Sequence, residues 1–151
     1  MDWLNEVQNR INRKNQVLFF KNSEFLANLA ALIQEQNHRT MVLWAFGFAD
    51  ETVQKLFARY PNEKRLEAAV LTSKDWAAGK VKMSVAQHAI LQAHAVAKGI
   101  DSPEDIALCH AVGQACGVVH TKGHAIGFPI YELTAIIRHY GVPECKKAVE
   151  E

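Results

Sequence analysis

The stretch SPEDIALCHAVGQACGVVHTKGHAIGFPIYELTAIIRHYGVP, residues 102–143, decides the fold of this chain. It opens with the strongest helix start in the sequence, because a Ser cap is followed by Pro at the first helical position and then by two acids. Helical spacing continues until Gly141 and Pro143 stop it. One helix over residues 103–139 would be about 55 Å long, whereas a domain of this size has a radius of gyration of about 15 Å. We therefore predict two helices joined around residues 121–123.

Helix start and stop signals of the same kind predict five further helices before this stretch. Residues that favour helix starts precede them, at Asp2, Ser23, Thr40, Asn62 and Ser84. Proline or glycine marks the ends of the last three, near Tyr60, Gly79 and Gly99. Residues 17–20, VLFF, have the composition of a short strand, but strand alternation is nearly absent elsewhere. We predict an all-α fold, a single domain over residues 1–151 built as an array or bundle of about seven helices with short connections.

Length and composition exclude several classes of protein. The chain has 151 residues, of which 49% are hydrophobic and 22% are charged, so it can bury a core without disulfides or a structural metal. Its 17 Lys and Arg against 16 Asp and Glu leave a formal net charge of +1, which provides no electrostatic footprint for nucleic acid. The polar N-terminus has no signal-peptide core, and the longest uncharged run, residues 106–121, is too short to span a bilayer. We therefore expect a cytoplasmic protein with no nucleic-acid or membrane partner.

The cysteine pattern favours free thiols, because the chain has three cysteines and no C-x-x-C pair. Cys109 and Cys116 lie on a predicted apolar helix, so we expect both to be buried and slow to react with a thiol reagent. Cys145 follows Pro143 in a polar tail, and we expect it to react quickly.

Histidine and glycine replace leucine along the predicted helix pair. Read at alternating steps of four and three residues, one seam contains Ile106, His110, Gly113, Gly117, His120, His124, Gly127 and Tyr131. Each glycine inside a helix costs about 1 kcal/mol relative to alanine, so Gly113 and Gly117 require a compensating contact. We predict that both face another helix so closely that a side chain does not fit. This seam, with Gly123 at the turn, is the candidate binding or packing surface.

Two interpretations compete for the histidines of the seam. His120 and His124 have the i, i+4 spacing of a two-imidazole metal site, with His110 or His88 as a third ligand. Alternatively, they are packing residues hydrogen-bonded to carbonyls or carboxylates near a helix junction. The chain has no H-E-x-x-H motif, and no acid lies on the seam to orient an imidazole. We therefore predict packing histidines and no cofactor. Because His88 and His94 are six residues apart, they do not form a pair on one face.

Several stretches of the chain together resemble a known family. They are WAFGFADETVQKLFARYP at 44–61, Arg65, Ala69, Val70, WAAG at 76–79, AHA at 93–95 and HAVGQACGVVHTKGHAIGFPIYELTAI at 110–136. This pattern is similar to the all-α immunity proteins of bacterial polymorphic-toxin systems, over about residues 41–137. We expect N-terminal helices in residues 2–36 to pack on this region. The chain departs from the family pattern at Gly47, where an acid is common, at Leu66, which replaces a proline, and at Pro129.

The resemblance implies a small cytoplasmic bacterial protein that binds and neutralises a toxin and has no catalysis of its own. Inhibitors of nucleases are often acidic, whereas this chain is almost neutral, so a plug for a nuclease active site is not the expected mode. Two alternatives remain. One is a histidine-based metal-dependent enzyme in a helical bundle, and the other is a homodimer formed through apolar helix faces.

Overall fold

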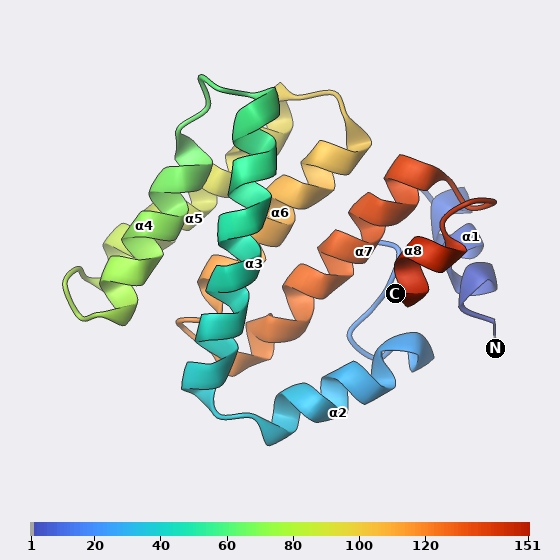
Figure 1. Ribbon diagram of the computed structural model, residues 1–151, viewed down its shortest axis with the longest axis horizontal. Coiled ribbons are helices and arrows are strands. Elements are labelled where there is room, and N and C mark those ends of the chain that lie inside the picture. The colour runs from blue at the N-terminus through green and yellow to red at the C-terminus, as the bar shows by residue number, and fades with distance from the viewer. Residues whose placement is uncertain (1) are drawn as a thin grey trace.

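The computed structural model describes residues 2–151, so residue 1 of the predicted domain lies outside the described residues. These residues form helices and no strand, which confirms the predicted all-α bundle (Figure 1). The α-helices are α1 (Trp3–Asn12), α2 (Ala27–Glu35), α3 (His38–Arg59), α4 (Arg65–Ala77), α5 (Met83–Ala95), α6 (Pro103–Gly117), α7 (Gly127–Tyr140) and α8 (Lys146–Glu150). Short 3₁₀ segments lie between them, η1 (Glu24–Leu26), η2 (Val96–Gly99) and η3 (Lys122–Ile126).

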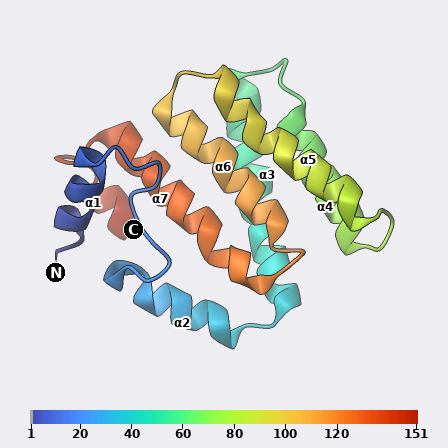
Figure 2. The same ribbon diagram turned by 180° about the vertical axis from the view of Figure 1, so that it is seen from behind.

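Helix α6 is the centre of the bundle. It packs against α3, α4, α5 and α7, and Figure 2 shows it lying between α5 and α7. Its buried residues include Ala107, Leu108, Ala111, Val112 and Cys116, which point to different sides of the helix. A helix that is apolar all round is stable only when other elements surround it, and this explains the weak amphipathic pattern of the sequence here.

Local capping signals place some helix ends correctly. Ser102 Oγ accepts a hydrogen bond from the Asp105 N–H, and Pro103 is the first residue of α6. Asp2 caps α1 by accepting from the Leu4 N–H. Gly79 follows α4 with φ of 75°, a left-handed conformation that glycine adopts without steric cost.

Other predicted helix starts are wrong. Helix α3 begins at His38, capped by Asn37, and not after Thr40. Helix α4 begins at Arg65 and not after Asn62, because a turn covers residues 60–63 and the Glu63 carboxylate then accepts from the Arg65 N–H. Ser84 does not cap α5, since it lies within the first turn of a helix that begins at Met83.

The break between α6 and α7 lies where it was predicted. Residues 118–121 leave the helical path after Gly117, and η3 turns the chain back so that α7 packs along α6. Pro129 causes no break, because it lies in the first turn of α7, where an unpaired backbone N–H is expected in any case.

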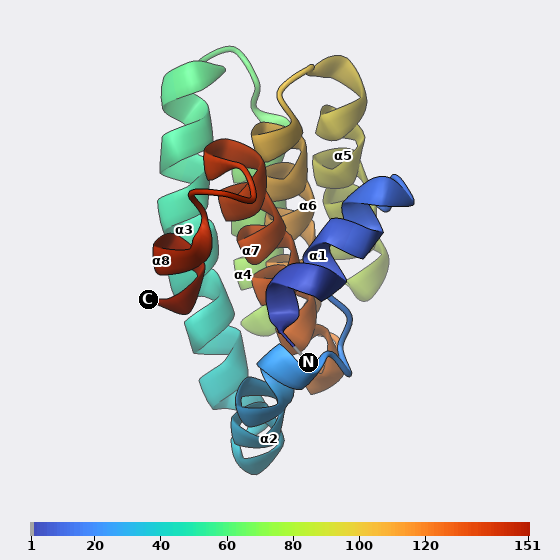
Figure 3. The ribbon, with the colours of Figure 1, turned by 90° about the vertical axis from the view of Figure 1, so that its right-hand side faces the viewer.

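A second core joins the two ends of the chain. It contains Val7, Leu18, Phe19, Leu26, Ile130, Ile137, Cys145 and Val149. Figure 3 views the molecule from the side on which α1 and α8 cover α7, and the Trp3 indole N–H there donates to Glu150. Residues 17–20 are not the strand that their composition indicated. They form a loop in which Leu18 and Phe19 are buried, Phe20 is exposed, and the Leu18 N–H donates to Thr134 Oγ1.

Cys145 belongs to this second core, and the prediction of an exposed, reactive thiol in a polar tail is wrong. Its side chain is fully buried because α8 folds back onto α7. Cys109 and Cys116 are also fully buried, as predicted, and burial raises the pKa of both thiols to about 12. None of the helices formed by residues 2–151 has the length and apolar character of a bilayer-spanning segment.

Candidate functional site

The residues of the predicted seam line more than one hollow. Gly113, Gly117, His120 and His124 line one cleft of about 330 Å³, which we name the histidine cleft. Its other lining residues come from α4, α5 and α6, and they are Trp76, Gln87, Ile90, Leu91, His94 and Gln114. His110 and Tyr131 line other hollows, nearer the N-terminal segment.

His94 and His110 form a hydrogen-bonded pair between α5 and α6. Their Nδ1 atoms are 2.8 Å apart, and Gln16 Nε2 lies 3.0 Å from His110 Nε2. Because an amide nitrogen only donates, His110 accepts at Nε2 and carries its proton on Nδ1. That proton is donated to His94, whose own proton is then on Nε2, beside Gly113. The ring of Tyr131 lies 5.2 Å from the His110 ring, measured between centroids.

Burial lowers the pKa of both imidazoles, and for His94 the neighbouring His110 lowers it further. Both rings are therefore neutral at pH 7, as the hydrogen-bonded chain from Gln16 requires. The sequence excluded a pair between His94 and His88, and the structure provides a different partner. His94 pairs with a histidine on the next helix.

The two glycines of α6 have different surroundings. A Cβ added at Gly113 would overlap the His94 ring, so this glycine faces another helix too closely for a side chain, as predicted. At Gly117 the nearest atom to such a Cβ is 3.6 Å away, in the His124 ring. This distance is ordinary van der Waals contact, and the prediction that no side chain fits at Gly117 is wrong.

Gly127 and Gly123 occupy the turn that follows. A Cβ at Gly127 would collide with the Gln114 side chain, so this glycine lets α7 begin close against α6. At Gly123 the nearest contact is Thr121 Oγ1 at 3.7 Å. The Gly123 N–H donates to the same Oγ1 at 3.3 Å, which makes this residue part of the predicted turn.

His120 and His124 are exposed, and the prediction that they are hydrogen-bonded packing residues is wrong. Within residues 2–151 neither ring makes a hydrogen bond. The His120 ring instead stacks on Trp76, with centroids 6.1 Å apart and planes 22° from parallel. His124 lies against Gly117. The hydrogen-bonded imidazole pair is instead His94 on α5 with His110 on α6.

The geometry does not support the metal interpretation. Among residues 2–151, no group of three or more His, Cys, Asp or Glu side chains is arranged to hold a metal ion. His110, the expected third ligand, uses both ring nitrogens for Gln16 and His94. His88 is exposed on α5 and does not line the histidine cleft.

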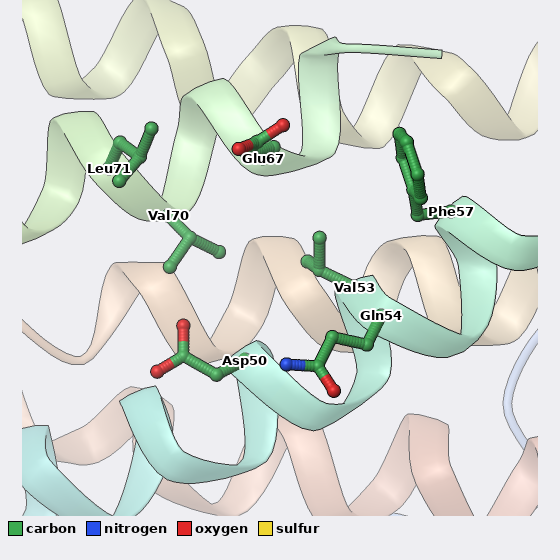
Figure 4. Close-up of a pocket in the computed structure, with 7 residues that line it drawn as sticks. All are labelled: Asp50, Val53, Gln54, Phe57, Glu67, Val70 and Leu71. Atoms are coloured by element: carbon green, nitrogen blue, oxygen red, sulfur yellow. The ribbon is translucent and has the colours of Figure 1, made fainter. Parts of the chain in front are cut away.

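A larger hollow of about 510 Å³ lies between α3 and α4 (Figure 4), and we name it the α3–α4 groove. Its lining residues are Asp50, Val53, Gln54, Phe57, Glu67, Val70 and Leu71. Figure 4 shows Val53 on α3 and Val70 on α4 directed toward each other across it. Phe57 and Leu71, which Figure 4 shows at opposite ends of the groove, are 44% and 55% exposed, respectively.

Sequence reasoning missed both the groove and the role of His94. His94 and His110 are 16 residues apart on different helices, so no helical period relates them. The groove did have a signal in the sequence. Gly47 lies inside the continuous helix α3, on the same face as the groove-lining Asp50, and an exposed mid-helix glycine has no explanation in helix propensity.

Comparison with known proteins identifies a family. No curated protein and no solved structure matches the chain. A family model described as Imm-5 like putative immunity protein matches residues 31–151, which extends past the predicted region of 41–137 at both ends. The unmatched residues contain α1 and the loop that carries Gln16. The chain therefore belongs to the Imm-5 like putative immunity protein family.

Proposed function

We propose that this chain is an immunity protein of a bacterial toxin system, which binds a toxin in the cytoplasm and neutralises it without catalysis of its own. The observation that carries the proposal is the family match over residues 31–151. The surface also supports it, because the α3–α4 groove exposes the apolar side chains of Phe57 and Leu71, which are suited to protein contacts.

The near-neutral charge of the chain bears on how the toxin is bound. With a formal net charge of +1, the chain does not imitate a phosphate backbone, so recognition rests on shape and apolar contact with a few placed charges. We therefore expect the complex to lose little affinity as salt is raised, in contrast to acidic inhibitors that occupy nucleic-acid sites.

The experiment begins with the open reading frame beside the gene of this chain, which the proposal expects to encode a toxic domain. Cells that express the domain should resume growth when the chain is co-expressed, and the two purified proteins should elute as one complex in size-exclusion chromatography. Neutralisation should be complete at one equivalent of chain, because a binder acts stoichiometrically. Protection at far lower ratios, with the toxin chemically altered, would instead show an enzyme. The chain run alone gives its oligomeric state and tests the homodimer.

A matched control uses a toxic domain from an unrelated toxin system in the same cells. Its toxicity should be unaffected by this chain, because immunity depends on a specific interface. Equal protection against both toxins, or no complex with the neighbouring domain, would contradict the proposal.

A further inference from the structure

Gly47 lies in the middle of α3 with no packing reason inside the chain. A Cβ added there would meet no atom of residues 2–151 within 4 Å, apart from the local backbone of the helix. Glycine at such a position weakens a helix relative to alanine, and the usual compensation is close approach of another element. Within the described residues that element is missing. Gly47 therefore leaves the backbone of α3 open on this face.

The residues around Gly47 form a stripe along α3 that leads into the groove. Leu43, Gly47, Asp50, Gln54 and Phe57 follow one another at steps of four and three, so they share one face of the helix. The two apolar ends of this stripe are exposed, Leu43 by 61% and Phe57 by 44%. The face is therefore apolar at both ends, with Gly47, Asp50 and Gln54 between them.

Helix α4 forms the opposite wall of the groove with Leu71, which is 55% exposed, and with Glu67. Figure 4 shows Asp50 and Glu67 on opposite sides of the paired Val53 and Val70. Lys74 binds both carboxylate oxygens of Asp50 at 2.9 Å. Within residues 2–151, Glu67 has no hydrogen-bond or ion-pair partner.

The charged side chains of the groove indicate which charge an occupant would carry. Lys74 neutralises Asp50, whereas Glu67 has no ion-pair partner among residues 2–151; the Lys64 ammonium lies 4.8 Å from the centroid of the groove-lining Phe57 ring. A cationic side chain of a partner would complement Glu67. The apolar floor between two helices is suited to a helix that inserts side chains at i, i+3 and i+4.

We propose that the α3–α4 groove is the toxin-binding surface, and that its occupant is a helix of the toxin which presents aliphatic side chains to Val53 and Val70 and a Lys or Arg to Glu67. This inference rests on the proposed function. Gly47 allows the partner helix to approach the α3 backbone closely, and Leu43, Phe57 and Leu71 form the apolar border of the contact.

The decisive variant is Gly47→Gln, measured by isothermal titration calorimetry against the toxic domain encoded beside the gene. Because glutamine favours helix over glycine and meets open space, the free variant should melt about 2–4 °C higher than the wild type. Its side chain should nevertheless cover the face and weaken toxin binding at least tenfold. A variant that gains stability and loses affinity cannot be explained by misfolding.

The matched control is Gly99→Gln. Gly99 is also exposed, and a Cβ there likewise meets nothing within 4 Å, but it lies on η2, away from the groove. This variant should bind within about twofold of the wild type. The charge is tested by Glu67→Gln, which should weaken binding about two- to fivefold at low salt, as for an exposed ion pair, and have no effect in high salt.

Each outcome decides the proposal. If the wild type binds the toxin and Gly47→Gln binds it equally well, the assignment of the groove is overturned and the proposed function remains. Absence of any complex between wild type and toxin overturns both. A wild-type homodimer that Gly47→Gln dissociates would identify a second copy as the occupant, and so overturn the assignment to the toxin.

Discussion

The substitution Gly113→Ala tests the packing of α6 on α5 most directly. The new Cβ would overlap the His94 imidazole, which cannot move without breaking its hydrogen bond to His110. Overpacking costs about 1–3 kcal/mol, and the lost hydrogen bond costs about 1 kcal/mol more. Against this, alanine improves helix propensity by about 1 kcal/mol. The free energy of unfolding should therefore fall by about 1–3 kcal/mol.

The assay is thermal and urea unfolding followed by circular dichroism. For a chain of this size, each kcal/mol lowers Tm by about 2–4 °C, so the loss is measurable. Gly47→Ala is the control, because it makes the same change in a helix where a Cβ meets open space, and it should raise Tm.

Repeating the substitution in a second variant separates the overlap with the His94 ring from other effects of Gly113→Ala. In a His94→Ala variant the obstructing ring is absent, so adding Gly113→Ala should no longer destabilise the protein. If Gly113→Ala in the wild-type chain melts at or above the wild-type Tm, the close approach of α5 and α6 at this residue is refuted.

Three further predictions concern thiols, histidines and a helix cap. All cysteines should resist a thiol reagent in the native state and react after unfolding, namely Cys109, Cys116 and Cys145. Folding lowers the pKa of His94 and His110 below 6.5, so the free energy of unfolding should be highest above pH 6.5 and should fall as the pH drops through the lowered pKa. Replacing both histidines with glutamine should reduce this loss of stability, whereas replacing the exposed His88 should not. Ser102→Ala should cost about 1 kcal/mol in urea unfolding by removing the cap of α6, while Ser84→Ala, which removes no cap, should cost nothing.

The sequence by itself determined the helical class and the helix ends that depend on neighbouring residues only. The cap at Ser102, the left-handed Gly79 and the turn near Gly123 are interactions over two to five positions, so their residue types are sufficient to locate them. The start of α4 was misplaced for a related reason. The side chains of Asn62 and Glu63 can both accept a hydrogen bond from the first backbone N–H groups of α4, and the sequence alone does not indicate which of them does so.

Only the tertiary structure decided which residues of α6 share a surface and which residues of other helices they contact. His94 meets His110, and Gly113 lies beneath the His94 ring while Gly117 does not, because the crossing of α5 over α6 sets which turns come close. The same applies to Cys145, which is buried by the return of α8 onto α7. Helical periodicity specifies the face of one helix, but the identity of the facing atoms depends on crossing angles and loop paths, which pack many distant residues at once.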